Sequence, residues 1–168
     1  NGTIEWSKEF IGSEKNPCIM QSDSENNLVL CGITEENSTF NGLPIPSIGD
    51  DDAYVIKLGP SGEIININSF GSHNNEYLLD FKIDDSNNYY FAINSKSDSI
   101  YGWNQIFEYN KLALAKLDEN LNYVWHGELD SRSISTQKIV VINPNKIVMA
   151  GEFRETISFE NIIYDSEI

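Results

Sequence analysis

The chain has 168 residues, a length typical of one compact domain, and carries 26 acidic against 11 basic side chains for a net charge of −15. A surplus of negative charge repels polyanions, which excludes nucleic acid and anionic membrane surfaces as expected partners. The longest aliphatic run, Ile139–Ile142, is far shorter than the ~20 apolar residues of a membrane-spanning helix. We therefore expect neither nucleic-acid binding nor membrane insertion.

Short apolar or alternating runs, separated by turn residues, predict β-strands from the N-terminus onward. The first four runs lie at residues 3–10, 18–22, 28–34 and 53–58. The segment Asp23–Asn27 between the second and third runs is rich in Asp and Asn, which tolerate the left-handed conformation of hairpin turns. No stretch shows the apolar recurrence of a helix. The pattern predicts an all-β protein made of antiparallel hairpins.

The same pattern recurs twice further along the chain. Trp6, Asn66 and Trp125 occupy one position of the pattern, 60 and 59 residues apart, and both tryptophans are expected in the core. The matching segments of a second strand are 28–32, 89–93 and 147–151. The repeats span about residues 1–58, 61–117 and 120–168, the last incomplete. Four strands in a repeat of this length are typical of β-propeller blades, so residues 1–168 are expected to form a single β-propeller fragment of about three four-stranded antiparallel blades.

The phase of the repeat predicts an incomplete ring. The tight hairpin is expected to be the inner strand pair of each blade, which makes residues 3–10 the outermost strand of a blade whose other strands lie elsewhere. Closed propellers have at least four blades. The remaining blades are therefore expected to come from a longer chain or from a second copy of this one.

Two segments resemble the repeats of a bacterial β-propeller family found in surface and secreted proteins. Residues 38–58 and 70–72 are similar to the family's glycine- and phenylalanine-containing segment, its Asp-x-Phe-Val strand and its Phe-Gly end. Residues 150–159 repeat the Gly, Phe, Thr and Phe of that pattern, whereas the second repeat has Asn66 for the family's Trp and Ile93 for its Gly. The resemblance implies a propeller fold and an extracellular or cell-surface location, with no catalytic signature.

The two cysteines flank the first predicted hairpin. A hairpin symmetrical about its turn places Cys18 directly opposite Cys31, within the distance that a disulfide spans. Such a bond fits an oxidising, extracellular compartment. The alternative is two buried thiols at small-residue positions, because Ala92 and Ala150 match Cys31 in the other repeats.

Residues with metal or catalytic chemistry are sparse. Asp50–Asp52 and Asp84–Asp85 carry oxygen ligands that Ca²⁺ prefers, but no calcium-loop motif surrounds them, and a turn role is favoured over calcium. His73 and His126 have no further ligands at zinc spacing. The sequence also lacks a nucleophile elbow and a phosphate-binding glycine loop. We therefore expect no metal site, no cofactor and no catalysis by this chain.

Aromatic residues gather in the segment inserted between the second and third strands of the second repeat. They are Tyr101, Trp103, Phe107 and Tyr109. Flat aromatic faces beside polar side chains suit sugar rings or the hot spot of a protein partner. The alternative is that these side chains pack between blades.

The fold and the aromatic segment together predict a non-catalytic extracellular or surface module that binds or scaffolds, presenting loops to a glycan or a protein. One alternative is a propeller enzyme acting on glycans, with its catalytic residues outside this chain. Another is a structural spacer of a large adhesin.

Overall fold

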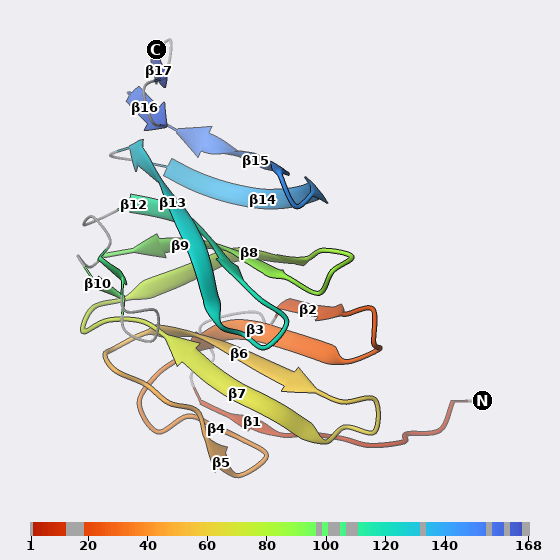
Figure 1. The fold of residues 1–168 in the computed structure, drawn as a ribbon. Helices are drawn as coiled ribbons and strands as arrows, with labels where there is room; N and C mark the ends of the chain where they lie inside the picture. The colour runs from red at the N-terminus through yellow and green to blue at the C-terminus, as the bar shows by residue number, and fades with distance from the viewer. Residues whose placement is uncertain are drawn as a thin grey trace.

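The computed structural model describes residues 2–12, 19–96, 99–100, 105–106, 111–131, 134–153, 156–159 and 162–165. Every regular element in these ranges is a β-strand, and the strands pair antiparallel (Figure 1). The prediction of an all-β, antiparallel fold is confirmed for these ranges. They contain no helix that could cross a membrane.

The structure contains two four-stranded meanders, as the repeat predicts, and two further short strands extend the second into a six-stranded sheet. The first runs β2 (Ile19–Ser22), β3 (Leu28–Thr34), β6 (Asp52–Leu58) and β7 (Ile64–Phe70) in that spatial order. The second runs β8 (Glu76–Ile83), β9 (Tyr89–Ser95), β12 (Lys111–Leu117) and β13 (Tyr123–Ser131). The hairpin of β14 (Ile134–Asn143) and β15 (Lys146–Phe153) follows them. Each meander combines the last three strands of one sequence repeat with the first strand of the next.

Short hairpins lie between these larger elements. They are β4 (Thr39–Phe40) with β5 (Leu43–Pro44), β10 (Ser99–Ile100) with β11 (Gln105–Ile106), and β16 (Thr156–Phe159) with β17 (Ile162–Asp165). Strand β16 pairs with the end of β13, where Asp130 lies opposite Ser158. Strand β4 pairs in the same way with β1 (Phe10–Ile11), where Phe40 lies opposite Phe10.

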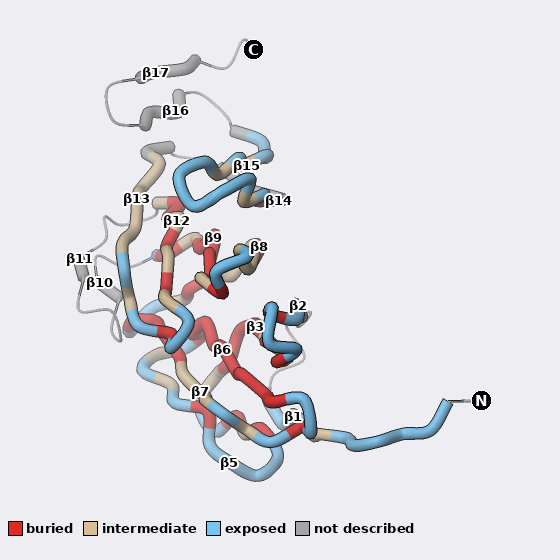
Figure 2. Tube along the Cα trace, turned by 45° about the vertical axis from the view of Figure 1, so that its right-hand side comes forward, coloured by how far each residue is buried: buried red, intermediate tan, exposed pale blue. Residues whose placement is uncertain are grey.

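The strand predicted at residues 3–10 is much shorter in the structure. Only Phe10 and Ile11 belong to a ladder, because β4 reaches no further along the segment and no other described strand lies beside it. Figure 2 shows the chain ahead of β1 running exposed along the edge of the molecule. The prediction of a full-length strand here is wrong for the described residues.

The sheets are stacked face to face, with apolar layers between them (Figures 1 and 2). Successive side chains of a strand point to opposite faces, so Val29 and Cys31 face the second sheet while Leu28 and Leu30 face away from it. The layer between the two sheets contains Val29, Cys31, Ala53, Val55, Phe70, Phe81, Tyr89, Phe91, Ile93, Ala113, Ala115, Leu117 and Leu121. A further layer joins the second sheet to β14 and β15 through Tyr90, Ala92 and Ile139. The stack formed by the described residues is open and does not close into a ring (Figure 1).

Candidate functional site

The two ends of the stacked sheets differ in their connections. Antiparallel strands place successive connections at alternate ends, and one end carries tight turns at 23–27, 59–63, 84–88 and 118–122. We call this the turn end. The opposite end, called the loop end here, carries the longer connections 35–51 and 96–110 and the shorter 71–75.

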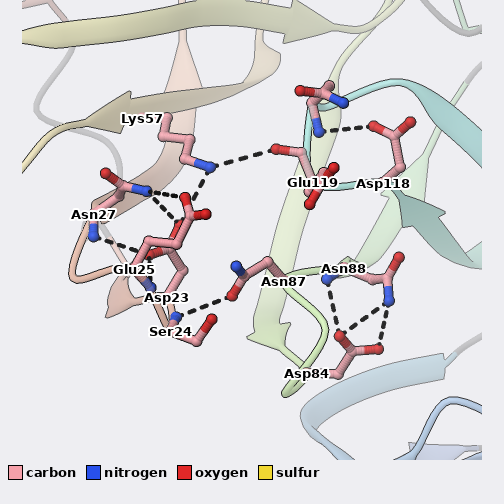
Figure 3. Close-up of polar contacts among 11 residues, drawn as sticks. Asp23, Ser24, Glu25, Asn27, Lys57, Asp84, Asn87, Asn88, Asp118 and Glu119 are labelled. Atoms are coloured by element: carbon pink, nitrogen blue, oxygen red, sulfur yellow. Dashed lines mark hydrogen bonds and ion pairs between the residues drawn. The ribbon is translucent and has the colours of Figure 1, made fainter.

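Three of these turns are built by one repeated side-chain hydrogen-bond pattern (Figure 3). Asp23 Oδ1 accepts hydrogen bonds from the backbone N–H groups of Glu25 and Asn27, both at 2.9 Å, and the Asn27 side chain donates to Asp23 Oδ2 at 2.9 Å. The turns that begin at Asp84 and Asp118 repeat these contacts. Burial alone would raise the pKa of all three aspartates, but the donated hydrogen bonds hold each pKa below its usual value.

The repeated pattern explains the acidic pair at residues 84–85. Asp84 organises its turn, whereas Asp85 is exposed to solvent. The turn interpretation of this pair is therefore confirmed.

Polar contacts at the turn end also join the first sheet to the second. The backbone N–H of Ser24 donates to Asn87 Oδ1 at 2.9 Å (Figure 3). The buried Lys57 ammonium forms an ion pair with Asp23 at 3.2 Å and donates to the carbonyl of Glu119 at 3.4 Å. These contacts fix the first sheet against the second at the turn end.

A second set of contacts links β2, β8 and β14, the first strands of successive sheets. The Gln21 amide donates to Phe81 O and accepts from Ile83 N, both at 3.1 Å, which ties β2 to β8. One sheet further on, Asp80 Oδ2 accepts from Ile139 N at 2.8 Å, which ties β8 to β14. A side chain of β2 is thus bonded to the backbone of β8, and a side chain of β8 to the backbone of β14.

The loop end holds an acidic depression of about 400 Å³. Its lining residues are Glu35, Glu36, Asn37, Gly49, Asp50, Asp51 and Asn75. Next to it, the buried Asp52 accepts a hydrogen bond from Gly49 N at 3.2 Å, so one carboxylate of the predicted Asp50–Asp52 cluster shapes its own loop. The residues that the structure describes bring no three His, Cys, Asp or Glu side chains together for a metal ion. The depression is an acidic surface whose oxygens can accept hydrogen bonds.

Glu76 lies buried at the junction of the two sheets beside this depression. Its carboxylate accepts from the Ser72 hydroxyl at 2.6 Å, the Ser95 hydroxyl at 3.0 Å and Ser72 N at 2.7 Å. Burial raises the pKa of Glu76 to about 6, with a further contribution from the nearby Asp52 carboxylate and opposition from the serine hydrogen bonds. Sequence reasoning missed Glu76, because it stands at the polar start of an apolar run, next to Asn74 and Asn75.

An apolar groove of about 350 Å³ lies between the segment ahead of β1 and the outer face of the first sheet. It is lined by Trp6, Lys8, Phe10, Met20, Leu28, Leu30, Ile33, Phe40, Tyr54 and Leu58. We call it the N-terminal groove. Trp6 rests against Gly62 and keeps 37% of its surface exposed, so its predicted core position is wrong. Its repeat equivalent Trp125 is half-buried and packs edge-on against Tyr90.

The residues predicted for binding and for the disulfide are only partly described. Tyr101, Trp103, Phe107, Tyr109 and Cys18 lie outside the described residues.

Cys31 is buried between the sheets and lies opposite Ile19. The expected register with Cys18 directly opposite is wrong by one residue, because the turn has five residues and Ser22 pairs with Leu28. The disulfide itself stays a prediction.

Comparison of the sequence with protein-family models and with curated proteins finds no match. The functional assignment therefore depends on the geometry of the sheets, the acidic depression and the groove.

Proposed function

We propose that this chain is an arc of a β-propeller that serves as a non-catalytic binding or scaffolding module, at the cell surface or outside the cell, and presents its loop end to a protein or a glycan. The observation that carries the proposal is the stacking of consecutive four-stranded meanders that share turn geometry and inter-sheet hydrogen bonds. A rigid stack of this kind holds its longer connections in fixed positions, and binding residues are frequent on loops held by such scaffolds.

The loop end fits a binding role better than the turn end. Its acidic depression offers carboxylate and amide oxygens, which accept hydrogen bonds from sugar hydroxyls and from basic side chains. The connection that carries Tyr101 and Trp103 leaves β9 and enters β12 at this same end, since Ser95 and Lys111 are paired in the sheet. The proposed contact surface combines the depression with that connection.

Charge reversal at the loop end tests the proposal. Glu35→Lys with Glu36→Lys changes the net charge by +4 within the depression, and Asp85→Lys with Glu119→Lys makes the same change at exposed positions of the turn end. Retention on arrays of glycans and of surface proteins is measured for both variants. We expect the loop-end variant to lose about tenfold or more in retention, and the control variant to retain its ligand.

The identity of the partner class follows from a second pair of variants. Replacing Tyr101 and Trp103 by alanine removes flat stacking faces, so a glycan ligand loses retention while the melting temperature stays the same. Equal losses in the loop-end and turn-end charge variants contradict the proposal, because they indicate a general charge effect.

A further inference from the structure

The N-terminal groove is an apolar surface left open at one end of the stack. Met20 is 58% exposed and Phe10 36% exposed, and both line the groove with the buried or half-buried Leu28 and Leu30. Large apolar side chains that are exposed together mark surfaces that another element covers.

The equivalent surface one repeat later shows what covers such a groove. Phe81, Tyr89 and Phe91 follow Met20, Leu28 and Leu30 by 61 residues each, on the corresponding strands of the second sheet. All three aromatic side chains are fully buried. The side chains that cover them come from the first sheet, chiefly Val29 and Cys31 of β3 and Ala53 and Val55 of β6.

The segment leading into β1 has the position of a fourth strand. It pairs with the β4 hairpin as β13 pairs with the β16 hairpin, and β13 is the fourth strand of its sheet. In both complete sheets the third strand lies beside the fourth, as β6 does beside β7. Residues 4–9 have no such neighbour in the described part of the chain.

We propose that the N-terminal groove holds three antiparallel strands of a further repeat of this kind, supplied by the same polypeptide ahead of residue 2. The third of these strands pairs with residues 4–10, and the three strands together turn an apolar face onto Met20, Leu28 and Leu30. The inference rests on the propeller arc of the proposed function and names what completes it.

The source of the strands follows from the order of the chain. In both complete sheets the first three strands directly precede the fourth in sequence, which favours the same polypeptide. A second copy of this chain fits less well. The open face at the far end of the described stack belongs to the two-stranded hairpin β14–β15, which offers no third strand to pair with β1.

The test adds the missing strands. A copy of residues 19–61 is placed directly ahead of Gly2 in the 168-residue chain. The copy then continues into the segment equivalent to β7, and Gly2 takes the position that Gly62 has in the first sheet. A matched control extension carries Val29→Asp and Val55→Asp in the copy only. Hydrogen exchange at residues 4–9 is measured for the original chain and both extended chains.

We expect the extension to slow amide exchange in residues 4–9 by about tenfold or more, and the control extension to leave this exchange unchanged. Met20→Arg is expected to leave the melting temperature of the 168-residue chain unchanged and to lower that of the extended chain, because only there does Met20 become buried.

Three results overturn the inference. The first is an extended chain whose added copy exchanges rapidly or leaves residues 4–9 unprotected. The second is concentration-dependent protection of residues 4–9 in the original chain with dimers in sedimentation, which assigns the groove to a second copy. The third is equal protection by the control extension. None of these affects retention at the loop end, which the charge variants test separately.

Discussion

Replacing Asp80 by alanine is predicted to detach β14 from the second sheet. The Asp80 carboxylate is 1% exposed and accepts the hydrogen bond of Ile139 N at 2.8 Å, and Ile139 is itself fully buried. Lys82 at 3.0 Å and Lys138 at 3.7 Å also contact the carboxylate, but the Lys138 side chain is 69% exposed and returns to water at little cost. The buried N–H left without an acceptor costs about 1–3 kcal/mol, so we expect a loss of roughly 2–3 kcal/mol in the free energy of unfolding.

A matched variant separates the hydrogen bond from the charge. Asp80→Asn keeps a carbonyl oxygen for Ile139 N and is expected to cost only about 1 kcal/mol. Hydrogen bonds from Ile139 and Lys82 oppose the effect of burial and lower the pKa of Asp80. The contribution of its charge is therefore present above the unfolded value near 3.8 and is lost as the pH falls through the lower folded pKa.

The assay is urea denaturation together with amide exchange at Ile139. Exchange at this amide is expected to accelerate in Asp80→Ala far more than in Asp80→Asn, with the exposed Asp85→Asn as the control. Unchanged exchange at Ile139 in the alanine variant, or equal losses of stability in the alanine and asparagine variants, refutes the assignment of this contact.

Three further predictions concern single sites. Glu76→Gln is expected to raise the free energy of unfolding at pH 8 by at most about 2 kcal/mol. The folded pKa of about 6 exceeds the usual value of 4.5, so the wild type loses stability as the pH rises through that window. A gain that is the same at pH 4.5 and pH 8 in denaturation curves would contradict this prediction. Gly62→Ala places a Cβ 2.7 Å from Trp6 Cδ2 at a φ of 80°, so we expect a loss of about 1 kcal/mol with a change in tryptophan fluorescence, and an unchanged melting temperature would count against the contact. Mass spectrometry without reductant is expected to show a Cys18–Cys31 bond or two thiols, and a predominant intermolecular dimer would be incompatible with a hairpin at these residues.

The strands and turns were predictable because their causes are local. Alternating apolar residues and runs of Asp and Asn depend on chain geometry over a few residues, and the structure contains meanders and turns at these places. Within the candidate site, the acidic residues 50–51 could be singled out from sequence, whereas Glu35 and Glu36 could not. The path of the connection 35–51 brings these glutamates to the same depression as Asp50 and Asp51, and local sequence does not reveal that path. The turn at 118–122 shows the limit of local rules, since its left-handed position holds Leu121, with a φ of 66°, where the other turns have Gly or Asn.

Only the tertiary structure explains that leucine and the buried charges. A left-handed leucine costs roughly 1–2 kcal/mol, but burying its side chain between the sheets stabilises the fold by about 1.5–3 kcal/mol. Asp80 is similar, since its local partner Lys82 leaves room for a further donor, and the structure supplies one in Ile139 N, 59 residues away. The exposure of Trp6 was also decided at this level, because its equivalents Asn66 and Trp125 are half-buried within complete sheets, whereas no third strand lies beside residues 4–9 in the described part of the chain. Sequence alone determined which segments become strands, and the contacts between sheets determined which of their side chains are buried.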